Sequence, residues 1–134
     1  MTDLELMQLA AEARKMAYAP YSGFRVGAAL LTSEGRVYTG CNIENAAYGP
    51  TNCAERTAFF KAVSEGERSF AAIAITGGGG EDPNTLCAPC GVCRQVMAEF
   101  CDGAFRVILG TPAAVEVHTL QDLLPLSFGK SDLA

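Results

Sequence analysis

Three cysteines and one glutamate stand in this chain at the spacing of a metal centre with a carboxylate beside it. Cys53 precedes Glu55 by two residues, and Cys90 and Cys93 form a C-x-x-C pair further along the chain. A Zn²⁺ ion held by three protein ligands keeps its fourth tetrahedral position open for water, which distinguishes a catalytic site from a closed structural site. A carboxylate beside that water can take its proton and pass it to a substrate. The pattern therefore favours a hydrolytic zinc site in which Glu55 moves the proton.

The segment before Cys53 indicates how a thiol and a carboxylate two residues apart can serve one ion. Residues two apart in mid-helix point away from each other, so Cys53 must lie at a helix start. The preceding residues are polar, and Thr51 or Asn52 can cap a helix that runs from about Cys53 to Ser64. A helix N-terminus also stabilises thiolates through its free N–H groups.

Three thiolates leave the zinc site with a net negative charge, which weakens the metal as a Lewis acid. Arg56 follows Cys53 by three residues and lies on the same face of the predicted helix. We expect its guanidinium to hydrogen-bond the thiolates from outside the ligand set. The alternative is that Arg56 is a solvated surface residue, as most charged helix residues are.

The cysteine pattern also admits a closed structural zinc site, with Cys87 as fourth ligand, or a set of disulfides. A four-cysteine site has no need of Glu55 and usually consists of two C-x-x-C pairs. The chain has six cysteines and an acidic N-terminus without the core of a signal peptide, which favours metal binding or catalysis over disulfides. For Glu55 alone, the alternative is an acidic residue favoured by the helix dipole. His118, the only histidine, lies far from these motifs in sequence and is expected to be structural or exposed.

Length and charge narrow the class of protein. At 134 residues the chain is expected to form a single domain over residues 1–134. Its net charge of −5 disfavours a nucleic-acid partner, which would select a basic surface. The longest apolar stretches are too short to span a bilayer, so no membrane partner and a cytoplasmic location are expected.

The order of predicted elements indicates an α/β protein. A helix over 4–17 precedes a hairpin of strands 26–31 and 37–41. The helix from Cys53 and a strand over 70–76 come next, followed by a flexible glycine-rich loop over 77–84. A helix from about 90 to 101, a strand over 106–109 and a weaker edge strand over 115–118 complete the pattern. Such an order favours a mixed central sheet with helices on its faces.

The chain resembles the small homotetrameric cytidine deaminases along almost its whole length. Zinc deaminases in general carry an H-x-E or C-x-E motif followed by P-C-x-x-C. The resemblance rests on six segments: 19–22, 26–29, 40–48, 53–58, 89–95 and 123–125. It implies a three-layer α-β-α sandwich with a mixed sheet of about five strands. It also implies one Zn²⁺ per subunit, bound by Cys53, Cys90 and Cys93, with Glu55 as proton shuttle.

The same resemblance implies the substrate and the residues that bind it. The expected reaction is hydrolysis of cytidine and 2′-deoxycytidine to uridine and 2′-deoxyuridine with release of ammonia, as in pyrimidine salvage. Asn42 and Glu44 would hold the ribose hydroxyls, which suits an amide and a carboxylate. The pocket would also include Phe24 and Ala54. The resemblance further implies a homotetramer with shared active sites, in which Tyr48 and Phe128 reach the site of a neighbouring subunit.

Three other functions remain open from the sequence. The first is a deaminase of a related cytosine nucleoside analogue, such as the blasticidin type, against which Asn42 and Glu44 argue. The second is an editing deaminase acting on polynucleotides, which the acidic balance disfavours. The third is a non-catalytic binding module stabilised by zinc, which assays of metal content and ammonia release would identify.

Overall fold

A five-stranded mixed sheet forms the middle layer of the molecule. The computed structural model describes residues 1–133, and its strand order is β2-β1-β3-β4-β5. The β3–β4 pair is parallel and the other neighbouring pairs are antiparallel. The strands are β1 (Arg25–Thr32), β2 (Val37–Cys41), β3 (Phe70–Gly78), β4 (Arg106–Thr111) and β5 (Ala114–Thr119).

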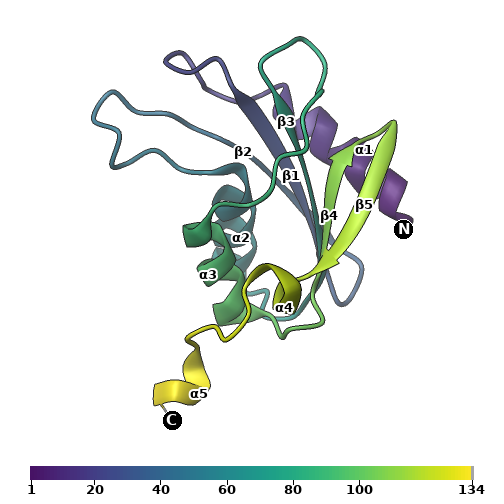
Figure 1. The fold of residues 1–134 in the computed structure, drawn as a ribbon, viewed down its shortest axis with the longest axis vertical. Coiled ribbons are helices and arrows are strands. Elements are labelled where there is room, and N and C mark those ends of the chain that lie inside the picture. Colours follow the sequence, from purple (N-terminus) through teal and green to yellow (C-terminus); the bar gives the residue numbers. More distant parts are fainter. Residues whose placement is uncertain (134) are drawn as a thin grey trace.

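Helices cover both faces of this sheet, which confirms the three-layer α-β-α prediction (Figure 1). Helix α1 (Asp3–Arg14) packs on one face, where Leu6, Met7 and Ala10 meet small strand residues such as Ala29. The other face carries α2 (Ala54–Ser64) and α3 (Gly91–Phe100). Two short helices close the chain, α4 (Leu120–Leu123) and α5 (Lys130–Leu133), and neither was predicted from the sequence.

Four phenylalanines pack together beneath α2 and α3. Phe59 on α2 is fully buried, and its ring centroid lies 5.2 Å from that of Phe70 and 6.2 Å from that of Phe100. Phe105 completes the group, 6.1 Å from Phe59. Aromatic pairs at such distances add to the stability that burial alone provides. The cluster joins the middle of α2 to the C-terminal end of α3, and the N-terminal ends of both helices carry the cysteine motifs.

Gly40 on β2 allows the start of α2 to lie directly against the sheet. A Cβ atom at this position would lie 2.5 Å from the carbonyl oxygen of Ala54 and 2.6 Å from the amide nitrogen of Ala58. Only glycine permits such an approach without a shift of the backbone. The position of the first turn of α2 therefore depends on this residue.

The predicted glycine-rich loop is held by a buried arginine from α1. β3 continues through Gly78, two residues beyond its predicted end. Arg14 is only 1% exposed, and its guanidinium donates to the carbonyl oxygens of Gly78, Gly80 and Glu81 at 2.5–2.9 Å. Loss of solvent lowers the pKa of Arg14. The loop over 77–84 is thus held by hydrogen bonds along much of its length, whereas its glycine-rich composition predicted a flexible segment.

Among the helices that the structure describes, none is long and apolar enough to cross a membrane.

Candidate active site

The starts of α2 and α3 bring three thiols together. Cys53 is the N-cap of α2 and Cys90 the N-cap of α3, both with extended backbone, and Cys93 lies in the first turn of α3. The Sγ atoms of Cys53 and Cys90 are 3.8 Å apart, and those of Cys90 and Cys93 are 3.5 Å apart. All three sulfur atoms lie within 4.8 Å of one another. A tetrahedral Zn²⁺ with Zn–S bonds of about 2.3 Å places its sulfur ligands about 3.8 Å apart, so the donor set fits zinc.

The prediction that Thr51 or Asn52 caps α2 is wrong, and the difference matters for the metal. Asn52 pairs with Ile43 in an isolated bridge, and its side-chain amide donates to the Thr57 hydroxyl at 3.1 Å. The cap position therefore passes to Cys53, whose side chain makes no capping hydrogen bond. Its thiol stays free to bind a metal beyond the end of the helix.

Arg56 contacts the thiol of Cys53, at a distance of 3.2 Å from Nη2 to Sγ. Hydrogen bonds from Cys93 and then Arg56 favour the Cys53 thiolate and lower its pKa to about 5. The Nε atom of Arg56 is buried and has no hydrogen-bond partner among residues 1–133. The side chain is therefore directed at the sulfur cluster, as the sequence predicts, and its effect on the metal stays a prediction.

Glu55 lies in the first turn of α2 and is only 4% exposed. Burial, together with the nearby charge of Cys53, raises its pKa to about 7. A carboxyl group whose pKa lies near neutrality can both accept and release a proton at physiological pH. This is the property that a proton shuttle requires.

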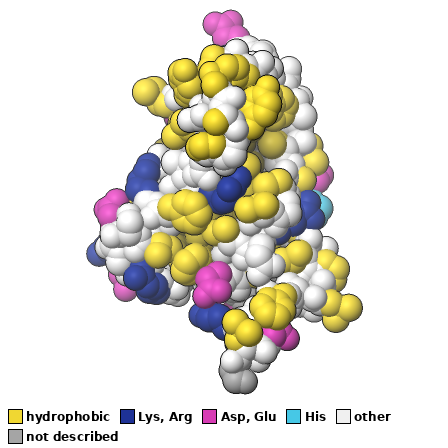
Figure 2. Space-filling model, turned by 90° about the vertical axis from the view of Figure 1, so that its left-hand side faces the viewer, with side chains coloured by type: hydrophobic (Ala, Val, Ile, Leu, Met, Phe, Trp, Pro, Cys, Tyr) yellow, Lys and Arg dark blue, Asp and Glu magenta, His cyan; other side chains and the backbone are white. Residues whose placement is uncertain are grey.

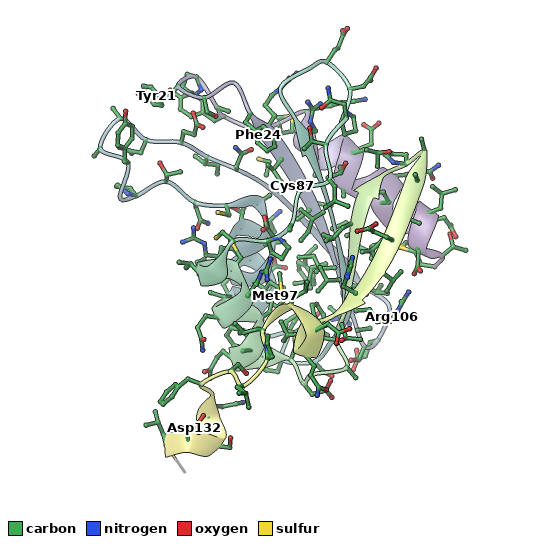
Figure 3. The ribbon with its side chains drawn as sticks, viewed as in Figure 1. Tyr21, Phe24, Cys87, Met97, Arg106 and Asp132 are labelled. Carbon is green, nitrogen blue, oxygen red and sulfur yellow. The ribbon has the colours of Figure 1, made fainter. Side chains whose placement is uncertain are left out.

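A pocket of about 250 Å³ connects the thiols and Glu55 to the substrate residues named from the sequence. Phe24, Asn42, Glu44 and Ala54 all line it, and so do Cys53, Glu55 and Cys90. Figure 3 shows Phe24 and Cys87 on neighbouring segments at this side of the sheet, with Tyr21 on the outer loop. The structure thus places the predicted sugar-binding residues and two of the three predicted metal ligands, Cys53 and Cys90, around one cavity, while Cys93 is buried beside them.

Asn42 fixes the start of β1 at the pocket wall. Its side-chain oxygen accepts from the amide of Val26 at 2.8 Å, and its side-chain nitrogen donates to the carbonyl of Phe24 at 2.8 Å. The amide orientation follows from these two bonds, because the donor and the acceptor face opposite partners. Asn42 therefore presents a defined edge to the cavity.

The carboxylate of Glu44 is held by the loop before β1. Its Oε1 accepts from the amides of Tyr21 at 2.9 Å and Ser22 at 3.1 Å, and its Oε2 accepts from the Ser22 hydroxyl at 2.5 Å. The hydrogen bond from the Ser22 hydroxyl lowers the pKa of Glu44. The carboxylate therefore stays ionised at pH values at which an ordinary glutamate begins to take up a proton.

Tyr48 and Phe128 do not reach the pocket of their own chain. Tyr48 is 75% exposed and lines an adjoining hollow with Tyr21 and Glu44. Phe128 is 59% exposed on the C-terminal segment, where it lines a separate hollow with Gln95. Figure 2 shows hydrophobic side chains gathered over the loops and helices of this face of the molecule. Whether the two aromatics complete the site of another subunit stays a prediction.

The structure adds Cys87 and Ser22 to the pocket residues predicted from the sequence. Cys87 lines the cavity but is not part of the thiol cluster, and burial raises its pKa to about 11. Ser22 lines both the cavity and the adjoining hollow. Arg94, which follows Cys93, donates to the carbonyls of Pro89 at 2.7 Å and Leu123 at 2.6 Å. Its position directly after Cys93 indicates a residue near the thiols, but its two carbonyl acceptors could not be predicted from the sequence.

Comparison with known proteins supplies the family. The model of the cytidine and deoxycytidylate deaminase zinc-binding region matches residues 1–111. The chain belongs to this family. It is 55% identical over 124 residues to a cytidine deaminase of Sporosarcina psychrophila, covering 92% of this chain and 88% of that protein. It is 50% identical over 129 residues to a cytidine deaminase of Halalkalibacterium halodurans, covering 96% and 95%.

A solved structure agrees with the fold as well as with the family. The crystal structure of cytidine deaminase from Burkholderia pseudomallei superposes with a TM-score of 0.87 at 50% identity, covering 96% of this chain and all of that one. Zinc is thus the metal of this family, and the Cys53, Cys90 and Cys93 cluster is the place in this chain that fits it.

Proposed function

We propose that this chain is a zinc-dependent enzyme that hydrolyses cytidine and 2′-deoxycytidine to uridine and 2′-deoxyuridine with release of ammonia. The observation that carries the proposal is the shared pocket, which is lined by the buried Glu55, by Cys53 and Cys90 of the thiol cluster, and by Glu44 and Asn42. The relatives named cytidine deaminase, at 50% to 55% identity over nearly the whole chain, support the same reaction.

Glu55 carries the protons of the reaction. Zinc, when bound, lowers the pKa of water at its open position and so supplies a nucleophile at neutral pH. Glu55 accepts a proton from the attacking water and gives it to the ring nitrogen next to the amine-bearing carbon. It then takes the proton of the newly added hydroxyl group and transfers it to the amine, so that the C–N bond breaks, ammonia leaves and the carbonyl of uridine forms. Its burial beside the cluster, which raises its pKa to about 7, suits both directions of transfer.

The other end of the pocket selects a nucleoside. Glu44 and Asn42 bind the ribose hydroxyls, since a carboxylate accepts from hydroxyl groups and an amide can both donate and accept. Phe24 and Ala54 supply apolar surface to the nucleoside between these groups and Glu55. A blasticidin-type substrate would leave the polar pair at this end without a ribose to bind.

The working enzyme is a homotetramer in which subunits share active sites. Tyr48 and Phe128 are large, exposed aromatics that do not line the pocket of their own chain. Insertion into a neighbour's site would bury them and enclose the nucleoside, because an open pocket on so small a chain provides limited contact area. The enzyme functions as one domain over residues 1–134, in the cytoplasm, in pyrimidine salvage.

A substrate panel tests the proposal. Zinc-loaded protein is incubated with cytidine, 2′-deoxycytidine, cytosine, cytidine monophosphate and blasticidin S, and ammonia release is measured. Turnover is expected with the two nucleosides and should fall sharply with cytosine, which has no sugar. Absence of turnover by protein with full zinc content would contradict the proposal and favour a binding module, whereas preference for blasticidin S would favour the analogue deaminase.

A further inference from the structure

Ser22 links the residues proposed to bind the ribose. Its hydroxyl donates to Oε2 of Glu44 at 2.5 Å and accepts from the backbone amide of Phe24 at 3.0 Å. The carbonyl of Phe24 in turn accepts from the side chain of Asn42 at 2.8 Å. One hydroxyl group therefore stands in a continuous hydrogen-bond chain that joins Glu44, Phe24 and Asn42, all three of which line the pocket.

We infer that Ser22 is a positioning residue, which fixes the carboxylate of Glu44 in the orientation that receives the ribose hydroxyls. The inference rests on the proposed function, since it deepens the role of the sugar-binding end of the pocket.

The geometry of Glu44 supports this role. A carboxylate offers about four acceptor positions. Three donors already occupy Glu44, namely the amides of Tyr21 and Ser22 and the hydroxyl of Ser22. Residues Tyr21 and Ser22 of the loop before β1 thus hold both carboxylate oxygens. The acceptor position that remains free therefore points in a fixed direction. The backbone of Glu44 is also fixed, because its amide donates to the carbonyl of Tyr18 at 2.8 Å.

Partial exposure explains why Glu44 needs such an anchor. The residue is half-buried, so packing restricts its rotamers only in part and water competes for its oxygens. The residues that line the pocket and the adjoining hollow include no lysine or arginine that could hold the carboxylate. The hydroxyl of Ser22 is the one side-chain donor that contacts Oε2 among the residues described. Loss of this hydroxyl leaves Oε2 without its side-chain donor, so the carboxylate group can rotate more freely.

The test compares Ser22→Ala with Ser33→Ala. Ser33 is also an exposed serine with a hydroxyl contact, 2.7 Å from the hydroxyl of Ser69, but it lies past the far end of β1. Ser22→Ala should raise the KM for cytidine roughly five- to tenfold, as the loss of an exposed hydrogen bond to a charged group implies. The kcat and the zinc content should stay close to those of the parent. Ser33→Ala should leave KM unchanged.

A conservative variant separates positioning from folding. Ser22→Thr keeps the hydroxyl, and the exposed position leaves room for the added methyl group. Its KM should lie within about twofold of the parent value, because both hydrogen bonds are retained. If Ser22→Ala lowers zinc content or kcat as strongly as it raises KM, the residue is structural and the inference is overturned.

A ligand that lacks the 2′- and 3′-hydroxyls of the sugar, and a double variant, test whether Ser22 acts through Glu44. The inhibition constant of 2′,3′-dideoxycytidine should be the same for the parent and for Ser22→Ala. In a Glu44→Gln background, adding Ser22→Ala should change the KM for cytidine by less than about twofold, since coupled residues are not additive. An equal penalty for dideoxycytidine, or full additivity with Glu44→Gln, overturns the inference.

The same experiments distinguish a failure of the inference from a failure of the proposed function. If Glu44→Gln raises KM and Ser22→Ala does not, only the positioning role of Ser22 is overturned. If Glu44→Gln leaves the KM for cytidine unchanged, the proposed ribose contact fails, and the inference fails with it.

Discussion

The two ends of the active-site pocket are built in different ways. At the metal end, two helix starts present Cys53, Cys90 and Cys93, and the buried Glu55 stands beside them. At the sugar end, loops supply the half-buried Glu44 and the exposed Ser22, and the orientation of Glu44 depends on hydrogen bonds. The helices of one chain supply the predicted metal ligands and Glu55. The sugar end, in contrast, is open, and Tyr48 lies in the hollow beside it. Substitutions at the first end should therefore affect metal and turnover, and those at the second should affect substrate affinity.

Glu55→Gln should have the largest effect. The amide cannot move protons, so turnover should fall by about a hundredfold or more while fold and zinc content persist. Steady-state kinetics and metal analysis on the same sample measure both quantities. Glu12→Gln, at an exposed glutamate on α1, is the control and should be as active as the parent. A Glu55→Gln enzyme with more than about a tenth of the parent activity would remove Glu55 from the role of proton shuttle.

Arg56→Ala should affect the metal end less severely. The guanidinium offsets the charge of the thiolates at 3.2 Å from Cys53, so its loss should weaken zinc binding or slow turnover by roughly ten- to a hundredfold. Competition with a zinc chelator measures the affinity. Arg68→Ala is the matched control, since that side chain donates to the carbonyls of Val63 and Glu67, near the C-terminal end of α2 and away from the thiols. If zinc affinity and turnover both equal those of the parent, the contact between Arg56 and Cys53 does not contribute to function.

Phe128→Ala tests whether the sugar end is completed by a second subunit. We expect the KM for cytidine to rise about tenfold, as for the loss of one aromatic contact with a bound base, with zinc content unchanged. Leu133→Ala, at another exposed apolar residue of the C-terminal segment, serves as control. Sedimentation of the parent as a tetramer is expected as well. A fully active monomer, or a KM that Phe128→Ala leaves unaltered, would contradict the shared site.

Arg14→Met should lower the thermal stability of the fold and, of the four variants, should affect the active-site pocket least. It leaves the carbonyls of Gly78, Gly80 and Glu81 without their buried donor, and the thermal midpoint should fall by roughly 5–10 °C. Thermal unfolding followed by circular dichroism measures the shift. Lys15→Met removes an exposed charge next in sequence and should leave the midpoint unchanged within about a degree. Equal midpoints for Arg14→Met and the parent would show that the loop does not depend on this arginine.

The regular elements were predictable because their signals are local. Apolar periodicity, turn residues and thiol spacing identified all five strands and the three longer helices to within a few residues. The contact between Arg56 and Cys53 followed from helix geometry alone. The short helices α4 and α5 carry too few residues for a periodic pattern to appear.

The features that the sequence did not reveal depend on distant partners. Arg14 lies on the apolar face of α1, and three of its four carbonyl acceptors lie more than sixty residues away, which no local pattern indicates. The N-cap of α2 shifted to Cys53 because Asn52 pairs with Ile43 across a loop. Ser22 was visible only as part of a family motif, since its function follows from the position of Glu44 on another segment.

The most direct test of the account is X-ray absorption spectroscopy at the zinc edge of the fully loaded protein. An open catalytic centre predicts three sulfur scatterers at about 2.3 Å and one lighter atom at about 2.0 Å, with the sulfur count unchanged in a Cys87→Ser variant. Four sulfur scatterers that become three in Cys87→Ser would contradict it, since zinc would then be closed by Cys87 and Glu55 would have no water to activate.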